Sequence, residues 1–146
     1  MAGRRGEIGA TFPLTDTEAA AIVARAEAAV KRYQREGAAR ERLVQAELEQ
    51  QHPSASVQRE QLLRDATGRK VKDPLTDTGR RIDHVVIEEQ TVVRSVETTS
   101  PTADKAAQIA KENRIRAAGG NYVRDRRTGQ LVPITEAVTT EVVRKN

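Results

Sequence analysis

The stretch RRIDHVVIEEQTVVRSVETTSPTADKAAQ (residues 80–108) decides how the chain folds, because it predicts two strands and a helix in succession. Residues 82–87 are mostly apolar on both alternating faces, which is typical of a buried central strand. Residues 88–90 are polar and mark a tight turn, and residues 91–99 are rich in the β-branched side chains that favour strands. The sequence therefore predicts a β-hairpin at the centre of a sheet, followed directly by a helix.

Two acidic residues interrupt the apolar strands of this hairpin, Asp83 in the first strand and Glu97 in the second. If the chain turns near Gln90, residues whose numbers sum to about 180 face each other, so the two acids come to lie opposite one another. Carboxylates inside a sheet are costly to desolvate unless a positive charge neutralises them, and a divalent cation does this most simply. In the alternative, Asp83 ends its strand or pairs with Arg81, and Glu97 faces solvent on an edge strand. His84 points to the opposite strand face and is expected to pack there.

Three motifs surround these acids: G-R-R-x-D-x-V-V (residues 79–86), V-E-x-T-S (residues 96–100) and K-x-x-Q (residues 105–108). The pattern resembles the PD-(D/E)XK nuclease superfamily, which has the restriction-endonuclease-like fold. More closely, it is similar to the nuclease domains at the C-terminal ends of bacterial polymorphic toxins, including contact-dependent growth inhibition toxins. The resemblance covers residues 37–125. Ile82 stands where the family name has proline.

The resemblance implies that Asp83 and Glu97 are catalytic metal ligands. Thr99 stands where the lysine of the family's E-x-K motif is expected, and its hydroxyl can hold a water or a phosphate oxygen without supplying positive charge. We expect Lys105, in the first turn of the next helix, to supply that charge instead. Gln108, one turn on, resembles the family's glutamine and is expected to position water or phosphate. The alternative for Lys105 and Gln108 is an exposed helix surface.

A third metal ligand is expected from the helix that precedes the hairpin. Val44 and Leu48 form an apolar stripe, and Glu41 lies on the same stripe one turn earlier. In the nuclease family a glutamate on this helix, shortly after a glycine, often completes the metal site, and G-x-x-x-E occurs here at residues 37–41. The alternative is that Glu41 is an ordinary surface glutamate between two arginines.

The implied fold is α/β: a restriction-endonuclease-like mixed β-sheet, with a central hairpin flanked by helices, over residues 37–146. An N-terminal leader and helical extension occupies residues 1–36. The implied function is metal-dependent hydrolysis of nucleic-acid phosphodiesters, with Mg²⁺ favoured and Mn²⁺ or Zn²⁺ as alternatives. Such an antibacterial toxin domain is neutralised by a cognate immunity protein, and the resemblance slightly favours tRNA over DNA as its substrate. It is delivered from the producing bacterium within a secreted or cell-surface protein and acts in the target-cell cytoplasm.

Composition narrows the classes of protein further. Hydrophobic residues make up 37% and aromatic residues only 2% of the 146, so the core must be aliphatic, and the net charge of +4 suits a polyanionic partner. The absence of cysteine excludes disulfides, thiolate zinc sites and cysteine nucleophiles. No apolar run approaches the roughly 20 residues of a membrane span, and no P-loop, Ser-His-Asp set or zinc-spaced histidine pair occurs. A non-catalytic interaction or nucleic-acid-binding module remains the alternative. Basic residues that could follow a phosphate backbone are Lys70, Lys72, Arg80, Arg81, Arg114, Arg116, Arg124, Arg126 and Arg127.

Start and stop signals divide the rest of the chain. Residues 1–13 lack periodicity and are expected to form a leader. Thr15 and Glu18 have capping-box spacing, which predicts a helix start, and Pro53 ends the helical pattern. Residues 57–63 predict the first strand of the sheet.

After the central hairpin, Ser100-Pro101 predicts a helix start and Gly119-Gly120 a helix stop. Residues 121–134 predict a second hairpin on the same sheet. Residues 135–146 have apolar side chains at helical spacing but a Val and Thr content that suits a strand, so both remain open.

Overall fold

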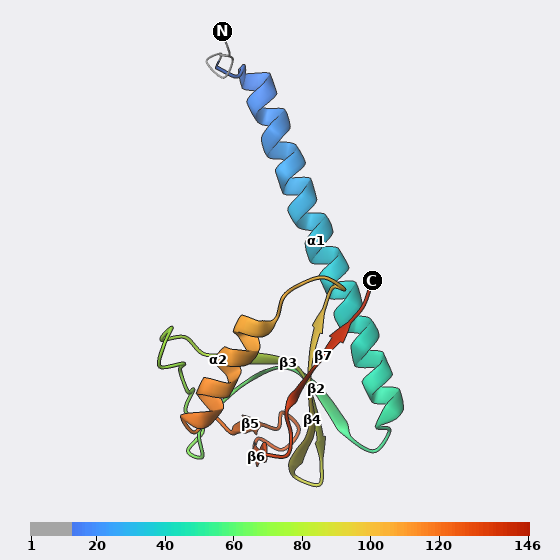
Figure 1. Ribbon diagram of the computed structural model, residues 1–146. Helices are drawn as coiled ribbons and strands as arrows, with labels where there is room; N and C mark the ends of the chain where they lie inside the picture. The colour runs from blue at the N-terminus through green and yellow to red at the C-terminus, as the bar shows by residue number, and fades with distance from the viewer. Residues whose placement is uncertain (1–12) are drawn as a thin grey trace. The chain divides into compact units, whose positions relative to one another are not determined.

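Two helices and two β-sheets make up residues 13–146, the part of the chain that this computed structural model describes (Figure 1). The leader expected over residues 1–13 therefore lies almost entirely outside the described residues. The architecture is mixed α/β, as the sequence predicts, and the main sheet is open. The elements in chain order are α1 (Asp16–Gln51), β2 (Ser56–Leu62), β3 (Arg81–Glu88), β4 (Thr91–Thr99), α2 (Ala106–Ala117), β5 (Tyr122–Arg124), β6 (Leu131–Pro133) and β7 (Thr140–Arg144).

The chain divides into two compact units, one ending at Glu36 and one running from Gly37 to Asn146. α1 spans this boundary, because a glycine lowers helix propensity without necessarily ending a helix. The predicted capping box is confirmed: the Thr15 N–H donates to Glu18 Oε1 (2.9 Å) and the Glu18 N–H donates to Thr15 Oγ1 (3.1 Å). The large apolar side chains of α1 in the first unit are exposed, and these are Ile22, Val23, Val30 and Tyr33.

The main sheet has the strand order β2-β3-β4-β7, so the predicted hairpin of β3 and β4 occupies its centre (Figure 1). β2 and β4 both pair antiparallel with β3, whereas β7 pairs parallel with β4, which makes the sheet mixed. The predicted hairpin register is confirmed, because His84 faces Val96 and Val86 faces Arg94, and each pair of numbers sums to 180. The tail, left open by its sequence, forms a strand because its β-branched side chains can continue the sheet beside β4.

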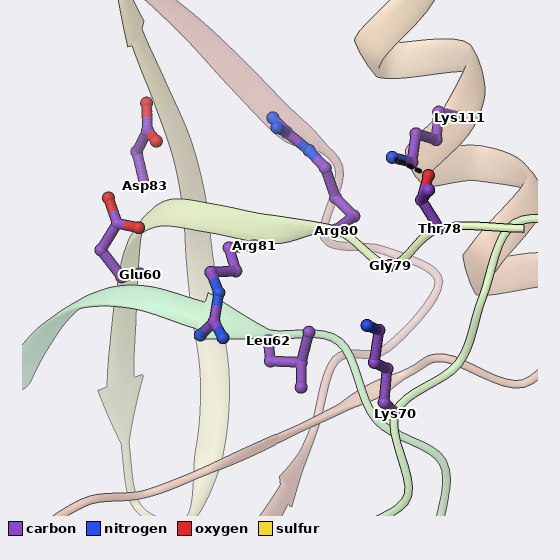
Figure 2. Close-up of a pocket in the computed structure, with 9 residues that line it drawn as sticks. All are labelled: Glu60, Leu62, Lys70, Thr78, Gly79, Arg80, Arg81, Asp83 and Lys111. Atoms are coloured by element: carbon purple, nitrogen blue, oxygen red, sulfur yellow. Dashed lines mark hydrogen bonds between the residues drawn. The ribbon is translucent and has the colours of Figure 1, made fainter. Parts of the chain in front are cut away.

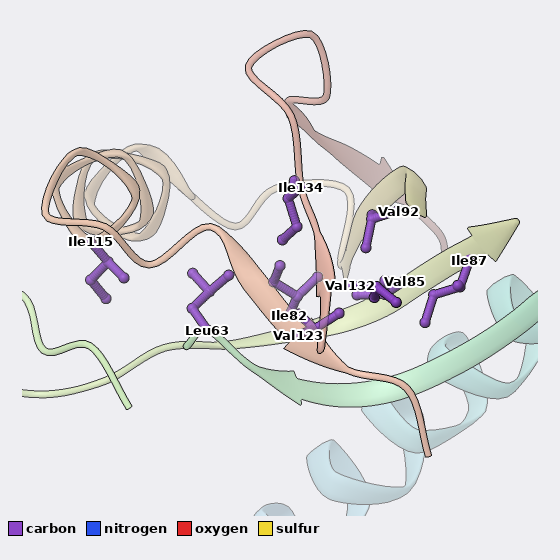
Figure 3. Packing of buried hydrophobic residues seen from close by; sticks show 9 residues of the cluster. All are labelled: Leu63, Ile82, Val85, Ile87, Val92, Ile115, Val123, Val132 and Ile134. Carbon is purple, nitrogen blue, oxygen red and sulfur yellow. The ribbon is translucent and has the colours of Figure 1, made fainter. Parts of the chain in front are cut away.

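The second predicted hairpin forms, but the expectation that it extends the main sheet is wrong. β5 and β6 pair with each other in a separate two-stranded sheet. Isolated bridges, such as that between Val92 and Ile134, touch the main sheet without extending it. The hairpin instead buries Val123 and Val132 in the core beside the main sheet (Figure 3), and this packing replaces pairing at the sheet edge.

The buried apolar side chains of the central hairpin belong to two separate clusters. One cluster joins the main sheet to the β5–β6 hairpin and to Ile115 of α2 (Figure 3). In the other cluster, Val44 and Leu48 of α1 pack against Val86 and Val96. The hairpin is therefore buried between two layers, as a central strand pair should be.

α2 begins at Ala106, later than the predicted start at Ser100-Pro101, because Asp104 rather than Ser100 accepts a free N–H group of the first helical turn. Asp104 Oδ1 accepts the Ala106 N–H at 2.9 Å. The segment before it is held by Arg144, whose Nη1 donates to Ala103 O at 2.7 Å. The predicted stop is confirmed, with Gly119 at φ +102°. Within the residues that the structure describes, neither helix is long and apolar enough to cross a membrane.

Candidate functional site

Asp83 and Glu97 lie on neighbouring strands at the end of the paired part of the hairpin. Pairing of β3 with β4 ends at His84 and Val96, and the same register continued by one residue sets Asp83 across from Glu97. Alternation turns both carboxylates to one face of the sheet and His84 to the other. The Thr98 N–H donates to Asp83 Oδ2 at 3.0 Å, which ties Asp83 to β4. The two acids therefore meet across the strands as the sequence predicts.

Glu97 is buried, with 3% of its surface exposed, so the alternative of a solvent-facing glutamate is wrong. Arg80 Nη2 donates to Glu97 Oε1, and Lys105 Nζ lies 3.6 Å from Glu97 Oε2. Burial, and then the negative charge of Asp83, raise the pKa of Glu97 to about 7, although Arg80 and Lys105 act in the opposite direction. The two cations therefore compensate the carboxylate pair only in part, and the pair retains an affinity for further positive charge.

Arg80 bridges two buried carboxylates, because it also approaches Glu112 of α2. Arg80 Nε lies 3.9 Å from Glu112 Oε1, and neither atom has a hydrogen-bond partner among the described residues. Thr140 Oγ1 donates to Glu112 Oε2, and Ser95 Oγ lies 2.7 Å from Thr140 Oγ1. A polar network therefore connects Glu97 to α2 and β7 beneath the acidic pair.

Lys105 stands just before α2 rather than in its first turn, because the helix starts at Ala106. From this position Lys105 Nζ reaches Glu97 and also donates to Gln108 Oε1 at 3.0 Å. Thr99 is buried at the end of β4, two residues after Glu97 and on the same strand face. The structure thus brings Lys105 beside Glu97 and Gln108 beside Lys105, and their role in a site stays a prediction.

Glu41 forms an ion pair with Arg59 of β2. Burial and then the charge of Asp83 raise the pKa of the Glu41 carboxyl, so Glu41 lies within the electrostatic field of the acidic pair. Among residues 13–146, however, no group of three or more His, Cys, Asp or Glu side chains has the arrangement of a metal site. Glu41 as a third metal ligand stays a prediction.

Glu60 is an acidic neighbour of Asp83 that the sequence did not single out. On β2, Glu60 lies between Arg59, which pairs with His84 of β3, and Gln61, which pairs with Ile82. Glu60 therefore lies opposite Asp83 of β3. Its φ of +56° is in the left-handed region, which is uncommon for a residue with a side chain inside a strand. No sequence pattern signals such a backbone conformation.

A cavity of about 510 Å³ opens beside Asp83. Figure 2 shows the carboxylates of Glu60 and Asp83 at one end of this cavity and the ammonium groups of Lys70 and Lys111 toward the other. Four cationic side chains line the cavity in all, and a guanidinium or ammonium group suits phosphate oxygens. The cations are Lys70, Arg80, Arg81 and Lys111.

His84 packs on the face opposite Asp83, as expected. It is fully buried, with Nδ1 3.0 Å from Gln45 Oε1 and Nε2 2.8 Å from Thr98 Oγ1. Burial lowers the pKa of His84, against a smaller raising effect of Asp83. A neutral imidazole that links α1 to β4 is a packing group rather than a general base.

Glu112 and Arg80 were missed as site residues, although part of the signal was available. Lys105, Gln108, Glu112 and Ile115 recur at three- and four-residue intervals, so they share one face of α2, and Ile115 marks that face as buried. Arg80 gave no comparable signal, because it was one basic residue among nine. Its role depends on a contact with Glu97, which only the fold specifies.

The donor set fits a magnesium ion that keeps most of its waters. Mg²⁺ takes one or two carboxylates and hard oxygen ligands in general, and Asp83 and Glu97 provide two. Within residues 13–146 Asp83 forms no ion pair, and Lys105 approaches Glu97 Oε2 without a hydrogen bond. Asp83 Oδ1 therefore has no partner among the described residues, whereas Glu97 Oε2 already lies beside the Lys105 ammonium.

Comparison of the chain with protein-family models, with curated proteins and with solved structures finds no match in any of the three.

Proposed function

We propose that residues 37–146 form a metal-dependent nuclease that hydrolyses nucleic-acid phosphodiesters, with Asp83 and Glu97 as its metal ligands. The observation that carries the proposal is a partly compensated carboxylate pair, one member of which, Asp83, lines a cavity together with four cationic side chains. Phosphodiester hydrolysis needs both features, because the carboxylates hold a metal and the cations hold the charged substrate.

The arrangement of the elements supports a restriction-endonuclease-like fold. The acids lie on the central hairpin of a mixed sheet, part of α1 packs on one face, and α2 packs with the β5–β6 hairpin in the other cluster. This mixed sheet with helices beside its central hairpin is compatible with the fold that the sequence resemblance implies.

Each side chain of the site has a role in this proposal. When bound, the metal supplies a water of lowered pKa and stabilises negative charge on the scissile phosphate. Lys105 contributes the positive charge that the lysine of E-x-K provides in the family, and Gln108 orients Lys105 through its Oε1. Thr99 offers a hydroxyl to water or phosphate. Glu41 adds negative charge near Asp83 and thereby strengthens cation binding.

The same resemblance supports the biological setting. We propose an antibacterial toxin domain that is delivered within a secreted or cell-surface protein, acts in the cytoplasm of the target cell, and is blocked by a cognate immunity protein. tRNA is the substrate that the resemblance favours, with DNA as the alternative. Mg²⁺ is the metal that the carboxylate donors favour.

A non-catalytic nucleic-acid-binding or interaction module is the second candidate, and one observation favours it. Arg80 donates a hydrogen bond to Glu97, and Lys105 lies near the same carboxylate. These two cations already neutralise part of the negative charge that a metal would neutralise. In this case the acids are structural and the basic cavity binds without cleaving.

A digest of total tRNA and plasmid DNA, side by side, tests the two candidates. The purified chain is incubated with each substrate in Mg²⁺ and in EDTA, with Mn²⁺ and Zn²⁺ added back separately. The nuclease proposal expects cleavage of one substrate in metal and none in EDTA. Binding of either substrate without cleavage under any of these conditions would instead support the non-catalytic module.

A further inference from the structure

A second cavity, of about 300 Å³, adjoins the one beside Asp83. The two share Glu60, Leu62 and Arg81 in their linings, so they are neighbours along β2 and the start of β3. The β5–β6 hairpin forms the far side of the second cavity. Four arginines line this cavity against two carboxylates, and they are Arg64, Arg81, Arg124 and Arg126.

Three of the four arginines of the second cavity are held by main-chain carbonyls, which leaves their charge uncompensated. Arg64 Nη1 donates to Gly68 O (2.9 Å), and Arg124 Nη1 donates to Gly129 O (2.7 Å). Arg126 Nη2 donates to Glu60 O (3.0 Å). Among the described residues none of these arginines forms an ion pair.

Other arginines of the same unit are neutralised by carboxylates. Arg94 binds Glu141 through two nitrogens, and Arg114 binds Asp73 in the same way. A carbonyl fixes the direction of a guanidinium without cancelling its charge, whereas a carboxylate does both. Arg64, Arg124 and Arg126 are therefore oriented and still available to an anion, and Arg81 is exposed beside them.

We propose that the two cavities form one track for the sugar-phosphate backbone of the substrate. Asp83, which lines the first cavity, faces the scissile phosphate, and Arg81, Arg124 and Arg126 hold phosphates further along the strand. This inference rests on the proposed nuclease function and adds to it where the rest of the substrate lies. In this proposal the β5–β6 hairpin, which does not join the main sheet as predicted, provides two of the phosphate contacts, from Arg124 and Arg126.

The chemistry of the lining selects backbone over bases. Among the described residues that line the two cavities, none is aromatic, so base stacking has no platform there. Guanidinium groups contact phosphate oxygens through two N–H groups at once, and contacts of this kind carry no sequence information. The track should therefore bind many sequences with similar affinity and with a strong dependence on salt.

Equilibrium binding of a short labelled oligonucleotide in EDTA, repeated over a series of salt concentrations, tests the track without any cleavage. Arg81→Gln and Arg124→Gln should each lower the slope of log K against log salt by about 0.7 for a single strand or about 0.9 for a B-form duplex. Arg127→Gln is the matched control, because Arg127 belongs to the same hairpin, is exposed and lines neither cavity. Its slope should stay close to that of the wild-type chain.

Two further variants keep the test independent of folding. Arg124→Lys keeps the charge and should keep most of the slope that Arg124→Gln loses. Arg81 is exposed and makes no side-chain hydrogen bond with the described residues, so Arg81→Gln should melt like the wild-type chain. If Arg124→Gln melts at a lower temperature than the wild-type chain, the salt dependence of binding by Arg81→Gln tests the track.

Equal slopes for Arg81→Gln, Arg127→Gln and the wild-type chain would overturn the track. Failure of the proposed function looks different, since cleavage would then be absent while the slopes still change. A wild-type chain that cleaves but shows unchanged slopes in the two cavity variants would keep the nuclease and remove the track.

Discussion

Lys105 Nζ lies 3.6 Å from Glu97 Oε2, although Lys105 belongs to the start of α2 and Glu97 to β4. The position two residues after Glu97, where the nuclease pattern has a lysine, holds the uncharged Thr99. The positive charge beside Glu97 thus comes from Arg80, just before β3, and from Lys105, just before α2.

Lys105→Ala should therefore slow cleavage more than Thr99→Ala does. Loss of one electrostatic contact to developing charge costs roughly 2–4 kcal/mol in the transition state. Single-turnover rates at saturating metal measure the difference, with Thr99→Lys expected to be tolerated. Normal cleavage by Lys105→Ala together with a dead Thr99→Ala would assign the working group to the hydroxyl.

Arg80→Ala should be strongly destabilising, because it leaves Glu97 and Glu112 buried without their shared cation. Removing one partner of a buried ion pair costs about 3–5 kcal/mol of unfolding free energy. Urea denaturation measures this, with Arg69→Ala as a control on an exposed arginine. The double variant Arg80→Ala/Glu112→Gln should recover part of the loss. A single variant as stable as the control would mean that Arg80 does not hold the two carboxylates.

Glu97 should make the stability of the metal-free protein depend on pH. Because the pKa of Glu97 is raised from 4.5 to about 7, the folded state keeps a proton that the unfolded chain has already released between these values. The unfolding free energy in EDTA should thus fall as the pH rises from 4.5 to about 7, and then level off.

Glu97→Gln removes this titration, so its stability relative to the wild-type chain should rise over the same pH window. At about 1.4 kcal/mol per pKa unit the relative gain is at most about 3 kcal/mol. Chemical denaturation at several pH values measures it, with Glu89→Gln, exposed at the hairpin turn, as the control. Parallel pH profiles for the wild type and Glu97→Gln would contradict the burial of an ionising carboxyl at this position.

Glu41→Gln should lower the cleavage rate more than the unfolding free energy. The pair of Glu41 with Arg59 is partly exposed, so its loss should cost under about 1 kcal/mol. Loss of a charge near Asp83 should slow cleavage by about tenfold or more, which corresponds to about 1.4 kcal/mol. The reverse order would return Glu41 to the role of a surface glutamate.

Local patterns of this sequence predicted much of the fold. The capping box at Thr15, the glycine stop after α2 and the register of the central hairpin each depend on residues close in sequence. The register is also fixed by alternation, because a slip of one residue would turn every apolar side chain to the wrong face.

Long-range packing explains what the sequence did not predict. The β5–β6 hairpin does not extend the main sheet, because Val123 and Val132 instead pack against apolar side chains of that sheet. The tail becomes β7 because β4 offers a free edge, which no local pattern reveals. The contact of Arg80 with Glu97, and the backbone of Glu60, likewise depend on neighbours that are distant in sequence.

Single-turnover cleavage by Asp83→Asn, with Mg²⁺ titrated over the substrate that the digest identifies, tests the central claim most directly. Asp83→Asn keeps the shape of the side chain and its hydrogen bond from the Thr98 N–H, but removes a metal-binding charge. We expect the folded variant to lose cleavage at every Mg²⁺ concentration, whereas Glu89→Gln should cleave like the wild-type chain. Cleavage by folded Asp83→Asn at the wild-type rate, or equal wild-type cleavage in EDTA, would contradict a metal-dependent site at this carboxylate pair.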